Sequence, residues 1–202
     1  MKWYLNILLT VLLVSSCNNK GSYPQTGDLV FFEAAQGNEF EDAINSATSD
    51  DSASFIHVAI VEVSNDSLFL IQAETDGVNR RLWDRSAEKA AYSIMRLRFS
   101  KPLAVRAVER AKTFIGQPYD WYYLPDNDAM YCSELVYESY LDDSGEHIFP
   151  AKPMNFRAAD GSMPQFWTEL FDSLGCPVPE GIPGTNPNDL SRSPLLEKIT
   201  WQ

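Results

Sequence analysis

Two residues of this sequence combine the chemistry of a nucleophile with that of a base. Cys132 stands in the stretch YCSELVY, whose apolar residues have helical spacing, so the cysteine falls in the first turn of an expected helix. The free N–H groups and the dipole at a helix start lower the pKa of a thiol, and a nearby imidazolium lowers it further. We therefore predict that Cys132 is a free thiol with a lowered pKa that attacks a carbonyl carbon.

His57 is the imidazole that the sequence favours as the base. It lies in FIHVAIV, a β-branched run that predicts a buried strand, where an imidazole is costly unless another group uses or satisfies it. The second histidine, His147, lies in the expected loop SGEHIF. A strand histidine is more often structural, bonded to a backbone group, but its combination with a cysteine at a helix start favours the catalytic interpretation.

A third polar residue should hold the imidazole by accepting the proton of its other nitrogen. The stretch LFLIQAET predicts a strand that forms a hairpin with the histidine strand, and alternation places Gln72 and Glu74 on one face of it. Glu74 is the stronger acceptor but sits nearer the strand end, whereas Gln72 is more central. Spacing alone leaves both open.

The N-terminus predicts export. Lys2 precedes an apolar run too short to span a bilayer, which is typical of a secretory signal. The run ends in VSSC, which resembles a bacterial lipobox and predicts lipidation of Cys17; an ordinary cleaved signal is the alternative. We expect a signal peptide over residues 1–16, a polar tether over 17–26 and one hydrolase domain over 27–202.

The two remaining cysteines, Cys132 and Cys176, leave two alternatives. An envelope compartment permits a disulfide between them, whereas the catalytic interpretation requires Cys132 to be free. The Cys132–His57 pair lacks the further close-spaced ligands of a zinc site, and the chain has no Gly-rich phosphate loop, so we expect neither a metal nor a cofactor. A formal charge of −12 disfavours binding to nucleic acid.

Strands and helices are segregated along the chain, which favours an α+β fold with an antiparallel sheet. The Pro-, Gly- and Asn-rich segment 176–196 is expected to be an ordered tail over the surface that ends in a short strand, and residues 76–78 should end the hairpin. The expected strands are 26–32, 55–63, 68–75 and 92–99, and the expected helices are 37–48, 100–116, 132–140 and 163–175.

The stretches GDLVFF, FIHVAIV, LIQA, IGQPYDW and YCSELVY together resemble the YiiX-like permuted papain-like amidase family, relatives of the NlpC/P60 cell-wall peptidases and of lecithin retinol acyltransferase. The similarity covers about residues 26–141, and the tail GTNPNDLSRSP is also similar. The histidine precedes the cysteine, as in the circularly permuted branch. The resemblance implies a permuted papain-like α+β fold, with an antiparallel sheet or barrel packed against helices, in which Cys132 is the nucleophile and His57 the base.

The resemblance also bears on the third residue and the cleft. The family often has Glu-Ala on the strand after the histidine, where this chain has Gln72-Ala73, so Gln72 is the implied third residue and Glu74 the alternative. The oxyanion hole would come chiefly from the backbone N–H of Cys132. The loop before the cysteine would wall the substrate cleft, with three aromatic residues against the substrate and an aspartate for a cationic group: Tyr119, Trp121, Tyr131 and Asp120.

These features predict a lipid-anchored cysteine amidase or peptidase of the bacterial cell envelope, on the periplasmic side or the outer membrane. It would cleave an amide bond, with a cell-wall peptide as the expected substrate. One alternative is a hydrolase or acyltransferase that uses the same residues on lipid or N-acyl substrates. Another is a binding lipoprotein with a dead site, which the departure at Gln72 brings into consideration.

Overall fold

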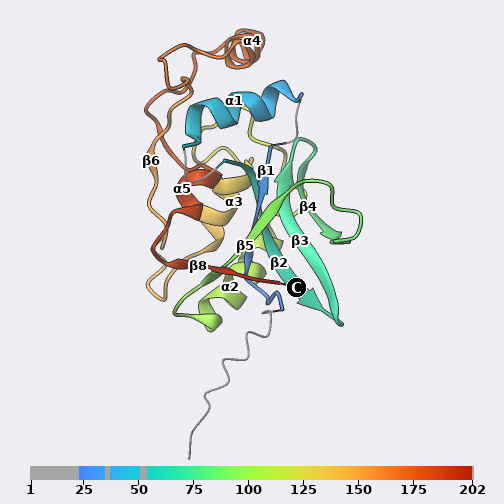
Figure 1. The fold of residues 1–202 in the computed structure, drawn as a ribbon. Helices are drawn as coiled ribbons and strands as arrows, with labels where there is room; N and C mark the ends of the chain where they lie inside the picture. Colours follow the sequence, from blue (N-terminus) through green and yellow to red (C-terminus); the bar gives the residue numbers. More distant parts are fainter. Residues whose placement is uncertain (1–22, 35–36, 51–53, 202) are drawn as a thin grey trace, which may run out of the picture.

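A six-stranded antiparallel sheet forms the centre of the protein, whose computed structural model describes residues 23–34, 37–50 and 54–201 (Figure 1). The predicted signal peptide, Cys17 and the start of the tether lie outside these residues. The strand order is β4-β3-β2-β1-β5-β8, and β6 and β7 pair separately. The predicted α+β class is confirmed. The strands are β1 Leu29–Glu33, β2 Phe55–Ser64, β3 Ser67–Glu74, β4 Gly77–Leu82, β5 Tyr92–Leu97, β6 Lys152–Pro153, β7 Pro183–Gly184 and β8 Leu196–Ile199.

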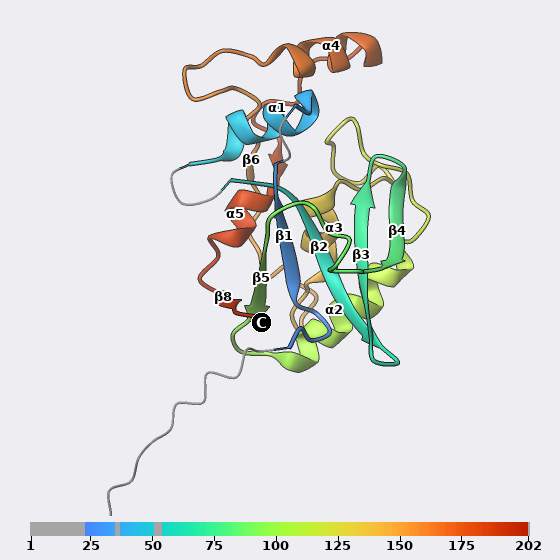
Figure 2. The ribbon, with the colours of Figure 1, turned by 45° about the vertical axis from the view of Figure 1, so that its right-hand side comes forward.

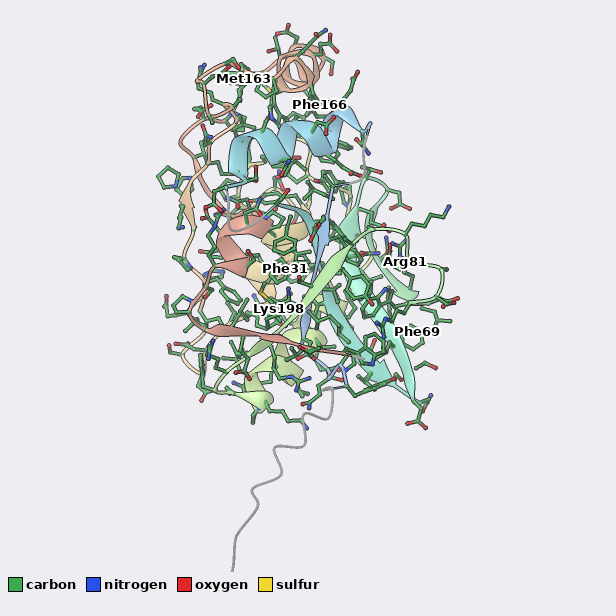
Figure 3. The ribbon with its side chains drawn as sticks, viewed as in Figure 1. Phe31, Phe69, Arg81, Met163, Phe166 and Lys198 are labelled. Atoms are coloured by element: carbon green, nitrogen blue, oxygen red, sulfur yellow. The ribbon has the colours of Figure 1, made fainter. Side chains whose placement is uncertain are left out.

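Two helices pack on one face of the sheet, and two others lie beyond its end. The helices are α1 Glu39–Thr48, α2 Lys101–Thr113, α3 Cys132–Ser139, α4 Gln165–Leu174 and α5 Pro187–Ser191. Helices α2 and α3 cover β2 and β3 (Figure 2), and α4 lies across α1. The Phe166 ring, labelled in Figure 3, lies 5.2 Å from that of Phe40 on α1. None of the helices in the described part of the chain combines the length and the hydropathy of a membrane span.

Strand β2 is buried on both faces, as its continuous apolar run predicts. Val58 and Ile60 belong to the core cluster beneath α2 and α3, whereas Ala59 and Val61 belong to the cluster on the opposite face. The pairs between β2 and β3 run from Ser64↔Ser67 to Ile60↔Ile71 and go no further. Beyond the last pair the two strands diverge (Figure 2), and His57 on β2 and Gln72 on β3 lie past that pair.

The hairpin ends close to residues 76–78, as expected, because β3 stops at Glu74, but the chain then turns into β4, a strand that the sequence did not predict. This strand was missed because GVNRRL is largely polar, lies at the sheet edge and exposes the side chains of its last three residues. Gly77 makes the turn with a φ of 112°, and a Cβ on it would lie 2.5 Å from the carbonyl oxygen of Gln117. Val78 N–H donates to that oxygen at 2.9 Å, so β4 fixes the loop that leads to Cys132.

The C-terminal segment is not a surface tail, which corrects the expectation from its composition. Asn188 on α5 is completely buried. Its amide nitrogen donates to the Phe55 carbonyl and to Thr48 Oγ1, and its Oδ1 accepts from Phe55 N–H at 2.7 Å. The Asn188 side chain thus satisfies the backbone N–H and carbonyl groups of Phe55, as a neighbouring strand would. Phe55 lies two residues before His57, so Asn188 ties the start of β2 to the end of α1.

Candidate active site

Cys132 is the first residue of α3, as predicted, and its side chain is buried at the sheet. Cys132 and Cys176 are both free, so the disulfide alternative does not hold. The helix start is capped by Glu134, whose Oε2 accepts from Tyr131 N–H at 3.4 Å. The cap and the surrounding core hold the thiol in one place relative to β2.

His57 and Gln72 meet beyond the last β2–β3 pair. His57 Nε2 lies 2.8 Å from Gln72 Oε1, and Gln72 is completely buried. An amide oxygen can only accept, so Nε2 carries the ring proton and Nδ1 keeps a lone pair. The ring packs 5.7 Å from the ring of Phe32. This arrangement leaves Nδ1 as the basic nitrogen.

Glu74, the alternative third residue, is occupied elsewhere. Its Oε2 accepts from Asn79 Nδ2 at 2.9 Å, and its Oε1 pairs with Arg81 at 2.9 Å. Arg81 is labelled at the β4 edge of the sheet in Figure 3. Glu74 affects His57 only through space, by raising its pKa. The structure therefore brings Gln72, and not Glu74, into contact with the imidazole.

Cys132, His57 and Gln72 line one cavity of about 390 Å³, called the polar cleft below. Residues from both faces of the sheet reach it because β2 and β3 diverge here. The residues that line the polar cleft include Phe32, Glu74, Arg81, Ala90, Phe40 and Tyr119. The cleft gives a substrate access to the thiol and the imidazole at the same time.

Burial, rather than the helix start, decides the pKa of the thiol. It raises the pKa of Cys132 to about 11, although the backbone N–H groups of Val58, Cys132 and Ser133 oppose this. Burial also lowers the pKa of His57, against the hydrogen bond to Gln72. The expectation of a lowered thiol pKa is therefore wrong for this site: at neutral pH the pair is a thiol and a neutral imidazole.

The four predicted cleft residues divide into two pairs. Tyr119 lines the polar cleft, and Tyr131 lines a second cavity described below. Trp121 lines neither cavity, and its ring packs 4.7 Å from that of Tyr119.

Asp120 is also outside both cavities and is completely buried. Its carboxylate accepts from the loop itself, from Tyr122 N, Leu124 N and Asn127 Nδ2. Asp120 therefore shapes the loop, and the expectation that it binds a substrate cation is wrong.

A second cavity beside Cys132 was not foreseen from the sequence. It encloses about 60 Å³ and is called the apolar pocket below. Its walls come from α1, β2, α3, α4, α5 and the loops between them, so no local pattern in the sequence could have indicated it. Its apolar lining includes Tyr123, Tyr131, Met154, Phe156 and Trp167.

Glu134 carries an unusual carboxyl group on α3, two residues after Cys132. Burial, with the nearby charge of Asp120 as a second cause, raises the pKa of Glu134 to about 8. His147, by contrast, stacks on Tyr137 at 3.8 Å and contacts Glu138, on the exposed side of α3.

Within residues 23–34, 37–50 and 54–201, no group of three or more His, Cys, Asp or Glu side chains could hold a metal ion.

Comparisons with known proteins bear on the family and the fold. A family model for the "permuted papain-like amidase enzyme, YaeF/YiiX, C92 family" matches residues 23–200. The chain is 25% identical over 198 residues to the uncharacterized protein YiiX of Escherichia coli (strain K12), covering 96% of this chain and 95% of that one. The crystal structure of YiiX from Escherichia coli O157:H7, described as a metalloprotein, matches with a TM-score of 0.71 at 22% identity, covering 89% of this chain and 98% of that one.

Proposed function

From the premise that the chain belongs to the permuted papain-like amidase family, a family of cysteine hydrolases, we propose that it cleaves an amide bond through Cys132, His57 and Gln72. We also propose that a lipid on Cys17 anchors it at the cell envelope. The observation that carries the catalytic proposal is the 2.8 Å contact between His57 Nε2 and Gln72 Oε1, in the cleft that Cys132 also lines.

Because Cys132 and His57 are both neutral before the reaction, the proton of the thiol moves during acylation. Cys132 Sγ attacks the amide carbon while His57 Nδ1 takes the thiol proton, so the thiolate forms only as it reacts. The negative oxygen accepts from the free N–H groups at the start of α3, chiefly that of Cys132. His57 then gives its proton to the amide nitrogen, the C–N bond breaks, and an amine leaves behind a thioester.

Deacylation reverses the proton movements with water as the nucleophile. His57 Nδ1 takes a proton from water as the oxygen attacks the thioester carbon. The C–S bond breaks, the acid leaves, and His57 returns the proton to Cys132 Sγ. One amide and one water thus give one acid and one amine, and both protein groups end as they began.

Gln72 acts as a positioning residue, because it touches the imidazole but not the reacting atoms. Its neutral oxygen fixes the tautomer and ring orientation without adding a negative charge, which would raise the pKa of His57. Although the family often has Glu-Ala at these positions, Gln72 still contacts the imidazole of His57. This contact favours a working enzyme over a binding protein with a dead site.

The charge of the polar cleft supports an amine as the leaving product. Four carboxylates and one guanidinium line it: Glu33, Glu41, Glu74, Glu88 and Arg81. An amine gains a proton on release and is then attracted by the net negative charge. A cell-wall peptide held next to an anchored enzyme is the substrate we propose. The runner-up, an N-acyl or lipid substrate, is favoured by the apolar pocket beside Cys132.

A thiol-directed probe and peptidoglycan-derived peptides test the proposal. The full-length protein is incubated with each peptide, and released amines and the mass of the acyl-enzyme are measured by mass spectrometry. Wild type and Cys176→Ala should form the adduct and release product, whereas Cys132→Ala and His57→Ala should not. Hydrolysis that persists in Cys132→Ala would assign the chemistry to other residues, and an unreactive wild-type thiol would favour the dead-site alternative.

A further inference from the structure

The described chain enters the domain at the end of the sheet that lies farthest from the candidate active site. Thr26 Oγ1 accepts from Val63 N–H at 3.1 Å, which places the first described residues beside the last part of β2. His57 is near the start of the same strand, and the rise of a strand separates it from Val63 by about 20 Å. Figure 1 shows the C-terminus and the start of α2 at the Val63 end, and α1 and α4 at the opposite end.

The proposed lipid on Cys17 restricts the surface that meets the bilayer. Cys17 is six residues before Tyr23, the first residue that the structure describes. Six residues span at most about 22 Å even when fully extended, whereas a domain of this size is roughly 40 Å across. A tether of this length is too short for the opposite end of the domain to turn towards the bilayer. The surface around Tyr23 is therefore the part that meets the lipids.

An aromatic cluster surrounds Tyr23. The Tyr23 side chain is 52% exposed, and its ring lies 5.6 Å from the ring of Trp201 in an edge-on arrangement. The guanidinium group of Arg85 lies 4.4 Å from the centre of the Trp201 ring. Tyrosine and tryptophan rings favour the boundary between headgroups and acyl chains, and an arginine beside them can bind lipid phosphates. The cluster therefore has the chemistry of a side chain group at a membrane interface.

The start of α2 extends this surface. Lys101 and Val105 share an open cavity with residues 24–26, so the first turn of the helix lies next to the aromatic cluster. Phe99, in the connection between β5 and α2, is 60% exposed, and Val105 is exposed on the helix. An exposed phenylalanine ring gains free energy when it leaves water. The anchor face, as this surface is called below, consists of Tyr23, Arg85, Phe99, Lys101, Val105 and Trp201.

The charges of the domain differ between its two ends. Two carboxylates next to the anchor face are neutralised by arginines, Asp28 by Arg96 at 2.7 Å and Glu197 by Arg98 at 3.7 Å. A bilayer with anionic lipids therefore attracts the exposed cations of the anchor face. The same bilayer repels the opposite end, where α1 and α4 carry a set of acidic residues: Glu39, Glu41, Asp42, Glu169 and Asp172.

We propose, on the basis of the lipid anchor in the proposed function, that the anchor face rests on the bilayer among the lipid headgroups. In this orientation the polar cleft lies at the far end of the domain, with about 20 Å of sheet between His57 and the membrane side. A substrate then reaches Cys132 from the space beyond the bilayer, whereas an acyl amide embedded in the anchoring bilayer does not reach it. The orientation selects a cell-wall peptide over a membrane lipid as the substrate class.

Photocrosslinking maps the face that touches the bilayer. The full-length protein is reconstituted into vesicles of phosphatidylethanolamine and phosphatidylglycerol that contain a phospholipid with a diazirine close to its headgroup. After illumination, mass spectrometry identifies the crosslinked residues. Crosslinks should concentrate at Tyr23, in residues 99–105 and at Trp201, and should be absent from α1 and α4. Crosslinks on α1 or α4, or an even spread over the domain, would overturn the orientation.

Two variants with the same change in charge test the anchor face. Phe99→Asp places a carboxylate on the face and should remove the crosslinks in residues 101–105. Ile115→Asp is the matched control, because Ile115 is also exposed but precedes Gly116, which bonds to Val78 at the other end of the sheet. It should leave the crosslinks unchanged, and thermal unfolding checks that both variants fold. Equal losses in both, or none in Phe99→Asp, would contradict the assignment. A dimer in detergent that Phe99→Asp dissociates would instead assign the face to a contact between two copies.

The same spectra separate failure of the orientation from failure of the proposed function. The mass of the N-terminal peptide shows whether Cys17 carries a lipid, and the mapping requires no turnover. A lipid on Cys17 with crosslinks confined to residues 18–22 would overturn the orientation and leave the anchor intact. Crosslinks on the anchor face of a chain without the lipid, or of a chain that hydrolyses nothing, would support the orientation while the anchor or the hydrolysis fails. If neither the lipid nor crosslinks on the anchor face are found, the orientation and the anchor both fail.

Discussion

Replacing Gln72 by alanine tests the part of the site that departs from the family's Glu-Ala. Gln72 is completely buried, and its Oε1 is 2.8 Å from His57 Nε2. The substitution leaves the ring N–H without an acceptor and opens space behind the ring. The imidazole can then rotate or exchange tautomers, so the fraction with Nδ1 directed at Cys132 falls.

The size of the effect follows from the lost hydrogen bond. A buried donor left without its partner costs about 1–3 kcal/mol. If the ring must recover its orientation in each turnover, a cost in this range appears in the barrier, and kcat falls roughly 10- to 100-fold. The value of KM should change little, because Gln72 orients the base and does not hold the substrate.

The assay compares kcat and KM of Gln72→Ala with those of Glu74→Ala, and thermal unfolding checks that both variants fold. Glu74 is the matched control, since it lies on the same strand face but binds Asn79 and Arg81 instead of His57. Its loss should change kcat by less than about three-fold, in line with an exposed ion pair. A larger loss at Glu74 than at Gln72 would refute the reasoning, and silence at both would mean that other groups hold the imidazole.

Three further outcomes are expected. Gln72→Glu places a carboxylate against the ring and raises the pKa of His57, so the acid limb of kcat/KM should move to higher pH; an unmoved limb would show that the residue does not contact the base. Glu134 has a pKa raised to about 8 in the folded state, so the folded protein holds a proton that the unfolded chain releases. The free energy of unfolding should therefore fall as the pH rises from about 5 to 8, by roughly 1.4 kcal/mol per pH unit. Glu134→Gln should flatten this slope in urea unfolding, and an unchanged slope would assign it to other groups. Cys17→Ser should release the protein from membranes in cell fractionation, and a variant that stays bound and keeps its lipid label would contradict the anchor.

The helices were predictable because their signals are local. Ser100 caps α2 and Pro102 occupies its first turn, and α1 and α4 carry their apolar residues at helical spacing, so each helix appears close to its expected range. Strand β4 and helix α5 were missed for the opposite reason. The edge strand has no apolar alternation, and Asn188 is polar yet buried because it bonds to Phe55, 133 residues away.

The sequence by itself determined the chemistry that is available and the order of its parts: a thiol at a helix start, an imidazole in a buried strand, and polar residues on the next strand. Only the tertiary structure decided how these parts act. The divergence of β2 and β3 brings Gln72 rather than Glu74 to His57, and burial raises the pKa of Cys132 against the helix start. Dihedral preferences and periodicity act over a few residues and are written in the local sequence, whereas desolvation and the walls of a pocket depend on segments that meet only when the chain is folded.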